Sequence, residues 1–306
     1  MAHSHSHSAH GHGAGHYHAP ADFGRAFAIG VVLNSAFVLI EATYGFLSGS
    51  MALVADAGHN LSDVLSLLLA WAAATAAKRP ASGRFTYGFK SSTILAALAN
   101  AGLLLVAIGA ILFETIRRFA EPAAVEGTTM IVVAGIGIVI NAGTAMLFMR
   151  GRHDDLNIRG AFLHMAADAL VSLGVVIAGV AILLTGANWV DPLTSLAIVA
   201  VIGWGTWGLL KDSVKMGLLA VPDRIAEEDV RGYLGQLAGV EAIHDLHIWP
   251  MSTTETALTA HLVMPGGHPG DAFLHRIAHE LEHKFGIGHA TVQVETEADA
   301  HCADCT

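Results

Sequence analysis

Residues 55–70 read ADAGHNLSDVLSLLLA, an apolar stretch that nevertheless carries Asp56, His59 and Asp63. A polar group taken out of water costs free energy unless it finds a partner, so ionisable residues in such a segment indicate a functional site. His59 and Asp63 are four residues apart and therefore lie one turn apart on the same face of a helix. We expect their partners elsewhere in the chain.

The whole chain shares this apolar character. Its 306 residues are 53% apolar and only 14% charged, whereas a soluble domain carries about a quarter charged residues. A membrane-spanning helix needs roughly 20 predominantly apolar residues. Six stretches qualify: residues 25–47, 51–77, 91–116, 128–149, 158–185 and 190–219. The sequence therefore predicts an α-helical membrane protein with six transmembrane helices, in a membrane domain over residues 23–220.

The positive charges that flank these stretches predict the orientation of the protein. On one side of the predicted membrane, only Arg117 and Arg118 flank the apolar stretches. The other side carries Arg25, Lys78, Arg79, Arg84, Lys90, Arg150, Arg152, Arg159, Lys211 and Lys215. Because positively charged loops stay on the cytoplasmic side, we expect both termini in the cytoplasm.

The N-terminal segment, residues 1–22, differs from the rest of the chain. It is hydrophilic and rich in histidine, so it lacks the apolar segment of a cleavable signal peptide and is typical of a disordered tract. Its imidazoles suit a low-affinity metal reservoir. An expression tag is the alternative interpretation.

Residues 221–297 are predicted to form a separate cytosolic domain. The chain turns acidic here, which suits a cationic ligand and argues against nucleic acid as a partner. Periodicity predicts a helix over 226–237, strands over 242–251 and 254–264, a helix opened by Pro269, and a strand over 290–296. This α-β-β-α-β order is typical of a ferredoxin-like α+β fold with helices on one face of a small sheet. We expect so small a domain to dimerise.

A second copy of the polar pattern lies in the fifth apolar stretch. Residues 161–173 read AFLHMAADALVSL, which places His164 four residues before Asp168. Two packed helices that each offer a histidine and an aspartate provide a tetrahedral ligand set suited to Zn²⁺, and two carboxylates neutralise a divalent ion. The alternative is that these residues only join helices by hydrogen bonds. Asp56 we interpret as a helix cap or a residue of the exit path.

Three segments resemble the signatures of the cation diffusion facilitator family, and of its zinc-exporting branch in particular: SGSMALVADAGHNLSD (48–63), HMAADAL (164–170) and AIHDLHIW (242–249). The resemblance implies six transmembrane helices and a cytosolic ferredoxin-like domain. It also implies a homodimer in a bacterial inner membrane that exchanges cytosolic metal ions for protons.

Carried onto this chain, the transport site of the family falls on His59, Asp63, His164 and Asp168. The histidine at the first of these positions points to Zn²⁺ as substrate, with Cd²⁺ and Co²⁺ as further candidates. Lys90 and Asp212 match a pair of charges that interlock in some members; ordinary charges at the membrane edge are the alternative.

The cytosolic domain carries a second group of candidate ligands. Strand alternation turns His261 away from the core positions on either side of it, and the tail at 298–306 contains a Cys-x-x-Cys pair. In a reducing cytosol such a pair favours metal binding over a disulfide. The resemblance implies a metal-sensing set: His244, His261, His289, Glu295, Cys302 and Cys305. Surface histidines and a frayed tail are the alternative.

The sequence also allows two other functions, a zinc protease and a zinc sensor or buffer. His279-Glu280-x-x-His283 matches the H-E-x-x-H pattern of zinc proteases. That pattern needs a buried cleft and a third ligand, whereas this pair lies opposite the apolar face of its predicted helix. We therefore expect no enzyme. A membrane-bound zinc sensor or buffer without transport is the other alternative.

Overall fold

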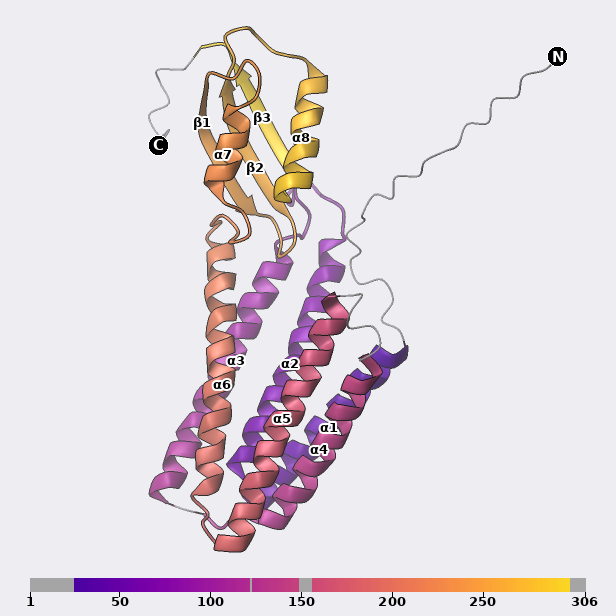
Figure 1. The fold of residues 1–306 in the computed structure, drawn as a ribbon, viewed down its shortest axis with the longest axis vertical. Helices are drawn as coiled ribbons and strands as arrows, with labels where there is room; N and C mark the ends of the chain where they lie inside the picture. Colours follow the sequence, from indigo (N-terminus) through magenta and orange to yellow (C-terminus); the bar gives the residue numbers. More distant parts are fainter. Residues whose placement is uncertain (1–24, 122, 149–155, 298–306) are drawn as a thin grey trace, which may run out of the picture.

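The computed structural model describes residues 25–121, 123–148 and 156–297. Six long helices form a bundle, and a small domain of helices and strands lies at one end of it (Figure 1). The helices are α1 (Arg25–Ser48), α2 (Met51–Ala77), α3 (Ser92–Ala120), α4 (Gly127–Phe148), α5 (Leu156–Thr185) and α6 (Val190–Gly217). All six apolar stretches predicted from the sequence are therefore helical.

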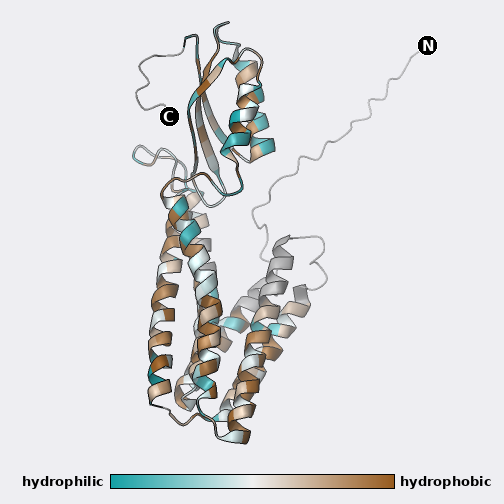
Figure 2. Cartoon of the chain, turned by 60° about the vertical axis from the view of Figure 1, so that its left-hand side comes forward, coloured by the Kyte–Doolittle hydropathy of each residue, from teal (hydrophilic) through white to brown (hydrophobic). Residues whose placement is uncertain are grey.

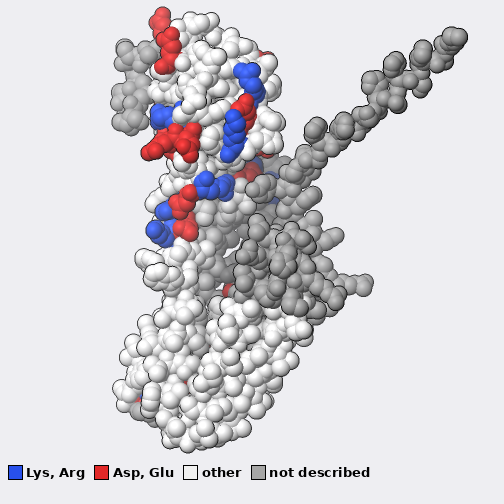
Figure 3. Space-filling view, viewed as in Figure 1, with Lys and Arg blue, Asp and Glu red and all other residues white. Residues whose placement is uncertain are grey.

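The composition of the bundle fits a membrane. Among the described residues, four helices, α3 to α6, are long and apolar enough to cross one, and the described part of α1 adds a shorter apolar helix. Apolar residues cover most of the bundle (Figure 2). On the face shown in Figure 3, charged residues gather on the small domain and at its junction with the helices, and almost none appear farther along the bundle.

Close packing of α4 against α5 fixes the position of the helix that carries Asp168. A Cβ atom added to Gly127 would come within 2.8 Å of the carbonyl oxygen of Gly179, and one added to Gly179 within 2.9 Å of the Ile131 side chain. Small residues at such a crossing let two backbones approach, which is how helices pack in lipid. The crossing lies near the end of the bundle that is remote from the small domain (Figure 1).

At that remote end, α2 begins with a hydrogen-bonded cap. Ser50 is its N-cap, and its hydroxyl oxygen accepts a hydrogen bond from the backbone N–H of Leu53 at 3.2 Å. Asp56 lies more than a turn further on, is fully buried, and accepts a hydrogen bond from Ser172 of α5. The interpretation of Asp56 as a helix cap is therefore wrong, because Ser50 fills that role.

The small domain has the predicted order of elements: α7 (Glu227–Gly235), β1 (Ala242–Pro250), β2 (Thr256–Val263), α8 (Asp271–Phe285) and β3 (His289–Glu295). Strand β2 is central; it pairs antiparallel with β1 and parallel with β3. Both helices lie on one face of the sheet (Figure 1). The predicted inward face of β2 is buried, and so is the apolar stripe of α8, of which Phe273, Ile277 and Leu281 are the buried residues.

The turn between β1 and β2 contacts the start of α3. Lys90 forms an ion pair with Glu255, the Ser91 hydroxyl donates to the carbonyl of Met251 at 3.2 Å, and the N–H of Thr253 donates to Thr93 Oγ1 at 3.1 Å. The partner of Lys90 is thus a residue of the small domain. The interlock of Lys90 with Asp212 suggested by the resemblance does not occur here; Asp212 lies exposed near the end of α6.

Candidate metal centre

Two helices bring three of the predicted ligands together inside the bundle. His59 Nε2 lies 3.4 Å from Asp168 Oδ1, and His59 Nδ1 lies 3.9 Å from Asp63 Oδ2. One ligand atom from each residue can be chosen so that all three lie within 4.8 Å of one another. His164 is on α5, one turn before Asp168, but its side chain lies outside the described residues. The i, i+4 spacing on α2 and the packing of α5 beside it create this geometry.

The 3.4 Å between His59 Nε2 and Asp168 Oδ1 suits two ligands of one metal ion. Two ligands of one tetrahedral zinc ion, each about 2.1 Å from the metal, lie about 3.4 Å apart. The His59 ring lies between the two carboxylates and turns one nitrogen to each, so a metal would take one of these nitrogens. Asp168 is almost fully buried, with 2% of its side chain exposed, whereas His59 and Asp63 expose 24% and 33%. Two carboxylates would balance the charge of a divalent ion in this low-dielectric setting.

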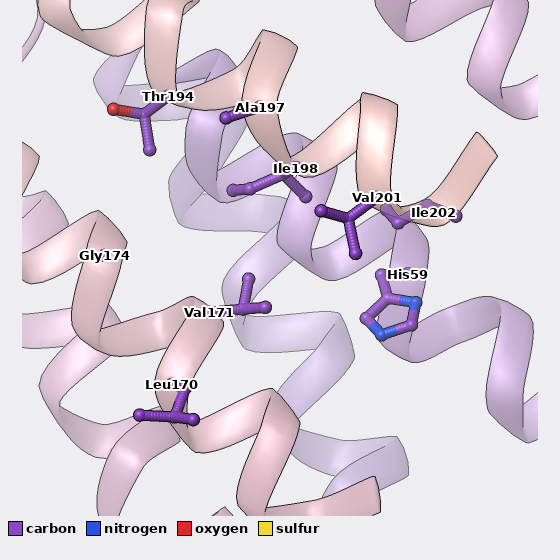
Figure 4. Close-up of a pocket in the computed structure, with 9 residues that line it drawn as sticks. All are labelled: His59, Leu170, Val171, Gly174, Thr194, Ala197, Ile198, Val201 and Ile202. Carbon is purple, nitrogen blue, oxygen red and sulfur yellow. The ribbon is translucent and has the colours of Figure 1, made fainter. Parts of the chain in front are cut away.

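A cavity of about 200 Å³ adjoins the site. Figure 4 shows His59 at one end of it, between residues of α5 and residues of α6. Its lining is apolar except for His59 and Thr194; the other residues are Leu170, Val171, Gly174, Ala197, Ile198, Val201 and Ile202. Because Gly174 and Thr194 lie toward the end of the bundle remote from the cytosolic domain, the cavity extends from His59 toward that end.

A layer of buried polar residues lies beside the centre, and sequence reasoning found only part of it. Glu41 of α1 is fully buried and accepts a hydrogen bond from Asn60 at 3.1 Å. Ser172 of α5 is also fully buried and donates to Asp56 at 3.0 Å. A lone glutamate within an apolar helix was the signal that could have identified Glu41.

The cytosolic domain contains a second group, formed by residues of all three strands. His244 of β1 is paired directly with His261 of β2, and Glu295 ends the neighbouring strand β3. The carboxylate of Glu295 lies 2.9 Å from His244 Nε2 through one oxygen and 2.9 Å from His261 Nδ1 through the other. The alternation that turned His261 away from the core thus brings it to Glu295.

The electrostatics of this second group favour an ionised carboxylate. Partial burial raises the pKa of Glu295, but hydrogen bonds from His244 and Gln293, with the nearby imidazoles, outweigh burial and hold its pKa below the ordinary value. The carboxylate is therefore charged at neutral pH and available to a cation. Each side chain in the group is partly exposed, so an ion could enter from the cytosol.

A β-bulge adds a residue that the sequence analysis missed. The register of β1 shifts between His244 and His247, and Asp245 has a left-handed φ of 52°. The bulge turns Asp245 toward two histidines, with its oxygens 2.9 Å from His247 Nε2 and 3.5 Å from His261 Nε2. Aspartate tolerates a left-handed backbone better than most residues, so the His-Asp-x-His pattern was the available signal.

The remaining predicted ligands do not join this group in the described structure. His289 begins β3 whereas Glu295 ends it, which separates them by about 20 Å at the rise of a strand. His289 is exposed, and its ring packs in a T-shaped arrangement against the ring of Tyr87. Cys302 and Cys305 lie outside the described residues.

The H-E-x-x-H pattern lies on the exposed face of α8. The rings of His279 and His283 are 4.2 Å apart and both residues are exposed. Lys284 donates a hydrogen bond to Glu280 at 2.7 Å and thereby lowers the pKa of that carboxyl group. A carboxylate held by an ammonium group is a poor general base, which a protease would need at this position.

Comparison with known proteins agrees with this architecture. Residues 27–216 match the transmembrane domain of cation efflux proteins, and residues 222–297 match their cytoplasmic domain. The chain is 37% identical over 291 residues to the cadmium, cobalt and zinc/H⁺–K⁺ antiporter of Bacillus subtilis, covering 94% of this chain and 93% of that protein. It is also 37% identical over 281 residues to the zinc transporter ZitB of Escherichia coli, covering 91% and 88%.

A third relative is the metal cation efflux system protein CzcD of Cupriavidus metallidurans, 36% identical over 281 residues, or 92% of this chain and 89% of the relative. The two matched domains together cover nearly all of the described structure, and these relatives align along almost their full lengths. The chain therefore belongs to the cation diffusion facilitator family of cation efflux proteins.

Proposed function

We propose that the protein exports divalent metal ions, chiefly Zn²⁺ with Cd²⁺ and Co²⁺ as further substrates, in exchange for protons. The observation that carries this proposal is the convergence of His59, Asp63 and Asp168 from two helices inside the bundle. His164, on the same helix as Asp168, would complete the tetrahedral set. The names of the relatives support both the metals and the antiport.

The coupling follows from competition between metal and proton for the same side chains. A neutral imidazole and a carboxylate bind Zn²⁺ only when deprotonated, so metal binding releases protons and acid displaces the metal. Transport requires two states of the bundle that open the centre to opposite sides. The cavity beside His59 extends away from the cytosolic domain, which suits a release path to the outer side of a bacterial inner membrane. Both termini would then be cytoplasmic.

Zinc transport driven by a pH gradient tests this function. Purified protein is reconstituted into vesicles that contain a zinc-sensitive dye, and an acidic interior is imposed. We expect zinc uptake that requires the protein and collapses when an ionophore removes the gradient. Uptake that is absent, or that is indifferent to the gradient, would contradict the proposal. In the latter case the protein would be a zinc channel, and a protein that only binds zinc would be a sensor or buffer.

For the cytosolic domain we propose a regulatory metal site formed by His244, His261 and Glu295, with Asp245 adjacent. Cys302 and Cys305 remain predicted ligands. The matched cytoplasmic domain is a dimerisation domain, which supports a homodimer. Cations bound there would reduce repulsion between two acidic domains and so favour their approach.

Replacing Glu295 by glutamine is expected to weaken zinc binding to the cytosolic group at least about tenfold, because losing a direct ligand should cost no less than losing an outer-shell partner, which costs roughly 10–100-fold. The physical reason is that Glu295 contacts both histidines and is the ionised member of the group. Calorimetric zinc titration of the full-length protein in detergent provides the measurement. His289→Ala, at the other end of the same strand, is the matched control. A loss of binding in His289→Ala that equals the loss in Glu295→Gln would overturn the assignment.

A further inference from the structure

A pair of acidic side chains beside the metal centre has no part in the transport chemistry proposed above. Glu41 and Asp56 are both fully buried in the bundle. Each has one carboxyl oxygen hydrogen-bonded to a neutral donor: Asn60 Nδ2 donates to Glu41 Oε2, and Ser172 Oγ donates to Asp56 Oδ2. Burying two acidic groups in a membrane domain is costly, so their presence calls for a compensating interaction.

The other two oxygens are available for that interaction. Glu41 Oε1 and Asp56 Oδ1 are buried and receive no hydrogen bond from a conventional donor among the described residues. The two carboxyl groups nevertheless face each other, because Asn60, which donates to Glu41, follows Asp56 by one turn on the same face of α2. An ionised carboxylate only accepts hydrogen bonds, so a bond between two carboxyl groups requires one of them to carry a proton. Like charges this close also cannot both be ionised at low cost.

We propose that Glu41 and Asp56 share one fixed proton and act as positioning residues for the metal centre, a role that rests on the transport function proposed above. Their neutral donors place them well for this. Asn60 directly follows the ligand His59, and Ser172 lies one turn after the ligand Asp168. The pair thus joins α1, α2 and α5 beside the ligands. Its proton belongs to the structure and is not exchanged for zinc.

Amide substitutions test the shared proton. In Glu41→Gln the side-chain N–H₂ replaces the proton in the bond to Asp56, while the amide oxygen still accepts from Asn60. In Asp56→Asn the amide donates to Glu41 and its oxygen still accepts from Ser172. Either single change therefore keeps every hydrogen bond and the net charge of the pair. The double variant brings two N–H₂ groups face to face with no acceptor between them.

The experiment measures the melting temperature in detergent, zinc affinity and zinc flux across a range of pH for both single variants and the double variant. We expect both single variants to transport zinc within about twofold of the wild-type rate and with an unchanged pH profile. The reason is that each single variant keeps the hydrogen bonds and the net charge of the pair. The double variant is expected to lose at least about tenfold in zinc affinity. Its melting temperature should fall by more than the sum of the decreases in the two single variants. If the double variant does not fold while both single variants do, that result also supports the shared proton.

Two results would overturn the proposal. Loss of flux, or a shifted pH profile, in a single variant that melts normally would show that the pair has to ionise, as a proton carrier or second cation site does. A double variant that behaves as the sum of the single ones would show that no proton is shared. Asp63→Asn is measured in parallel. If Asp63→Asn retains zinc flux, the proposed transport site is wrong. The melting temperatures of the Glu41 and Asp56 variants would still test the shared proton independently.

Discussion

Replacing Asp168 by asparagine is expected to abolish zinc transport, with a loss of at least a hundredfold in rate. Asp168 is the most buried of the described ligands and lies 3.4 Å from His59. Without its charge, one carboxylate faces a divalent ion in the membrane interior, and removing one partner from a buried ion pair costs about 3–5 kcal/mol. Since each 1.4 kcal/mol is a factor of ten, this cost corresponds to roughly two to three and a half orders of magnitude.

The change is nearly isosteric, so the fold should survive it. Zinc flux into dye-loaded vesicles under a pH gradient is measured for wild type and for Asp168→Asn, and a matching melting temperature in detergent confirms folding. Asp271→Asn is the control, because it makes the same chemical change at an exposed helix start in the cytosolic domain. Flux in Asp168→Asn that equals wild type would remove Asp168 from the transport site.

The sequence predicted the features of this protein that depend on local spacing. A histidine and an aspartate four residues apart occupy one face wherever the segment is helical, so the spacing alone was enough to pair His59 with Asp63. Strand alternation likewise placed His261 on the side of the sheet opposite the core residue Leu262. Both predictions needed only that the segment adopt its expected secondary structure.

Features that depend on which segments meet could not be predicted in this way. The hydrogen bond from Asn60 to Glu41 joins α2 to α1, and the ion pair of Lys90 with Glu255 joins residues 165 positions apart. No periodicity within either segment specifies such a partner. Asp245 escaped prediction for another reason: its bulge interrupts the alternation from which strand faces are read. The resemblance suggested a ligand role for His289 and an interlock of Lys90 with Asp212. The described structure instead places His289 beside Tyr87 and pairs Lys90 with Glu255.

Asp191, at the start of α6, illustrates the same limit and gives the second prediction of large effect. It is fully buried and accepts three hydrogen bonds from the start of α2: from the Ser50 hydroxyl at 2.6 Å and from the N–H groups of Met51 and Ala52 at 2.8 and 3.1 Å. These N–H groups belong to the first turn of α2, which has no partners for them within the helix. A carboxylate there also interacts favourably with the helix dipole.

Asp191→Ala would leave these three donors without their acceptor in a buried setting. Unmade hydrogen bonds to a charged group cost about 1.5–3 kcal/mol each, and neighbouring losses do not add in full. We expect a total cost of about 4 kcal/mol, which lowers the melting temperature by about 10 °C in a protein of this size. Because α2 carries His59 and Asp63, zinc affinity should fall with stability.

Melting of the detergent-solubilised protein, followed with and without zinc, provides the measurement. Asp191→Asn keeps an oxygen acceptor but loses the charge, so it should melt between wild type and Asp191→Ala. Asp223→Ala removes an exposed carboxylate that pairs with Lys215 and serves as the control, since exposed pairs contribute little. If Asp191→Ala had the same melting temperature as Asp223→Ala, the start of α2 would be held by its own Ser50 cap and by the contact of Arg118 with the carbonyl of Gly49. The position of the metal-binding helix would then not depend on α6.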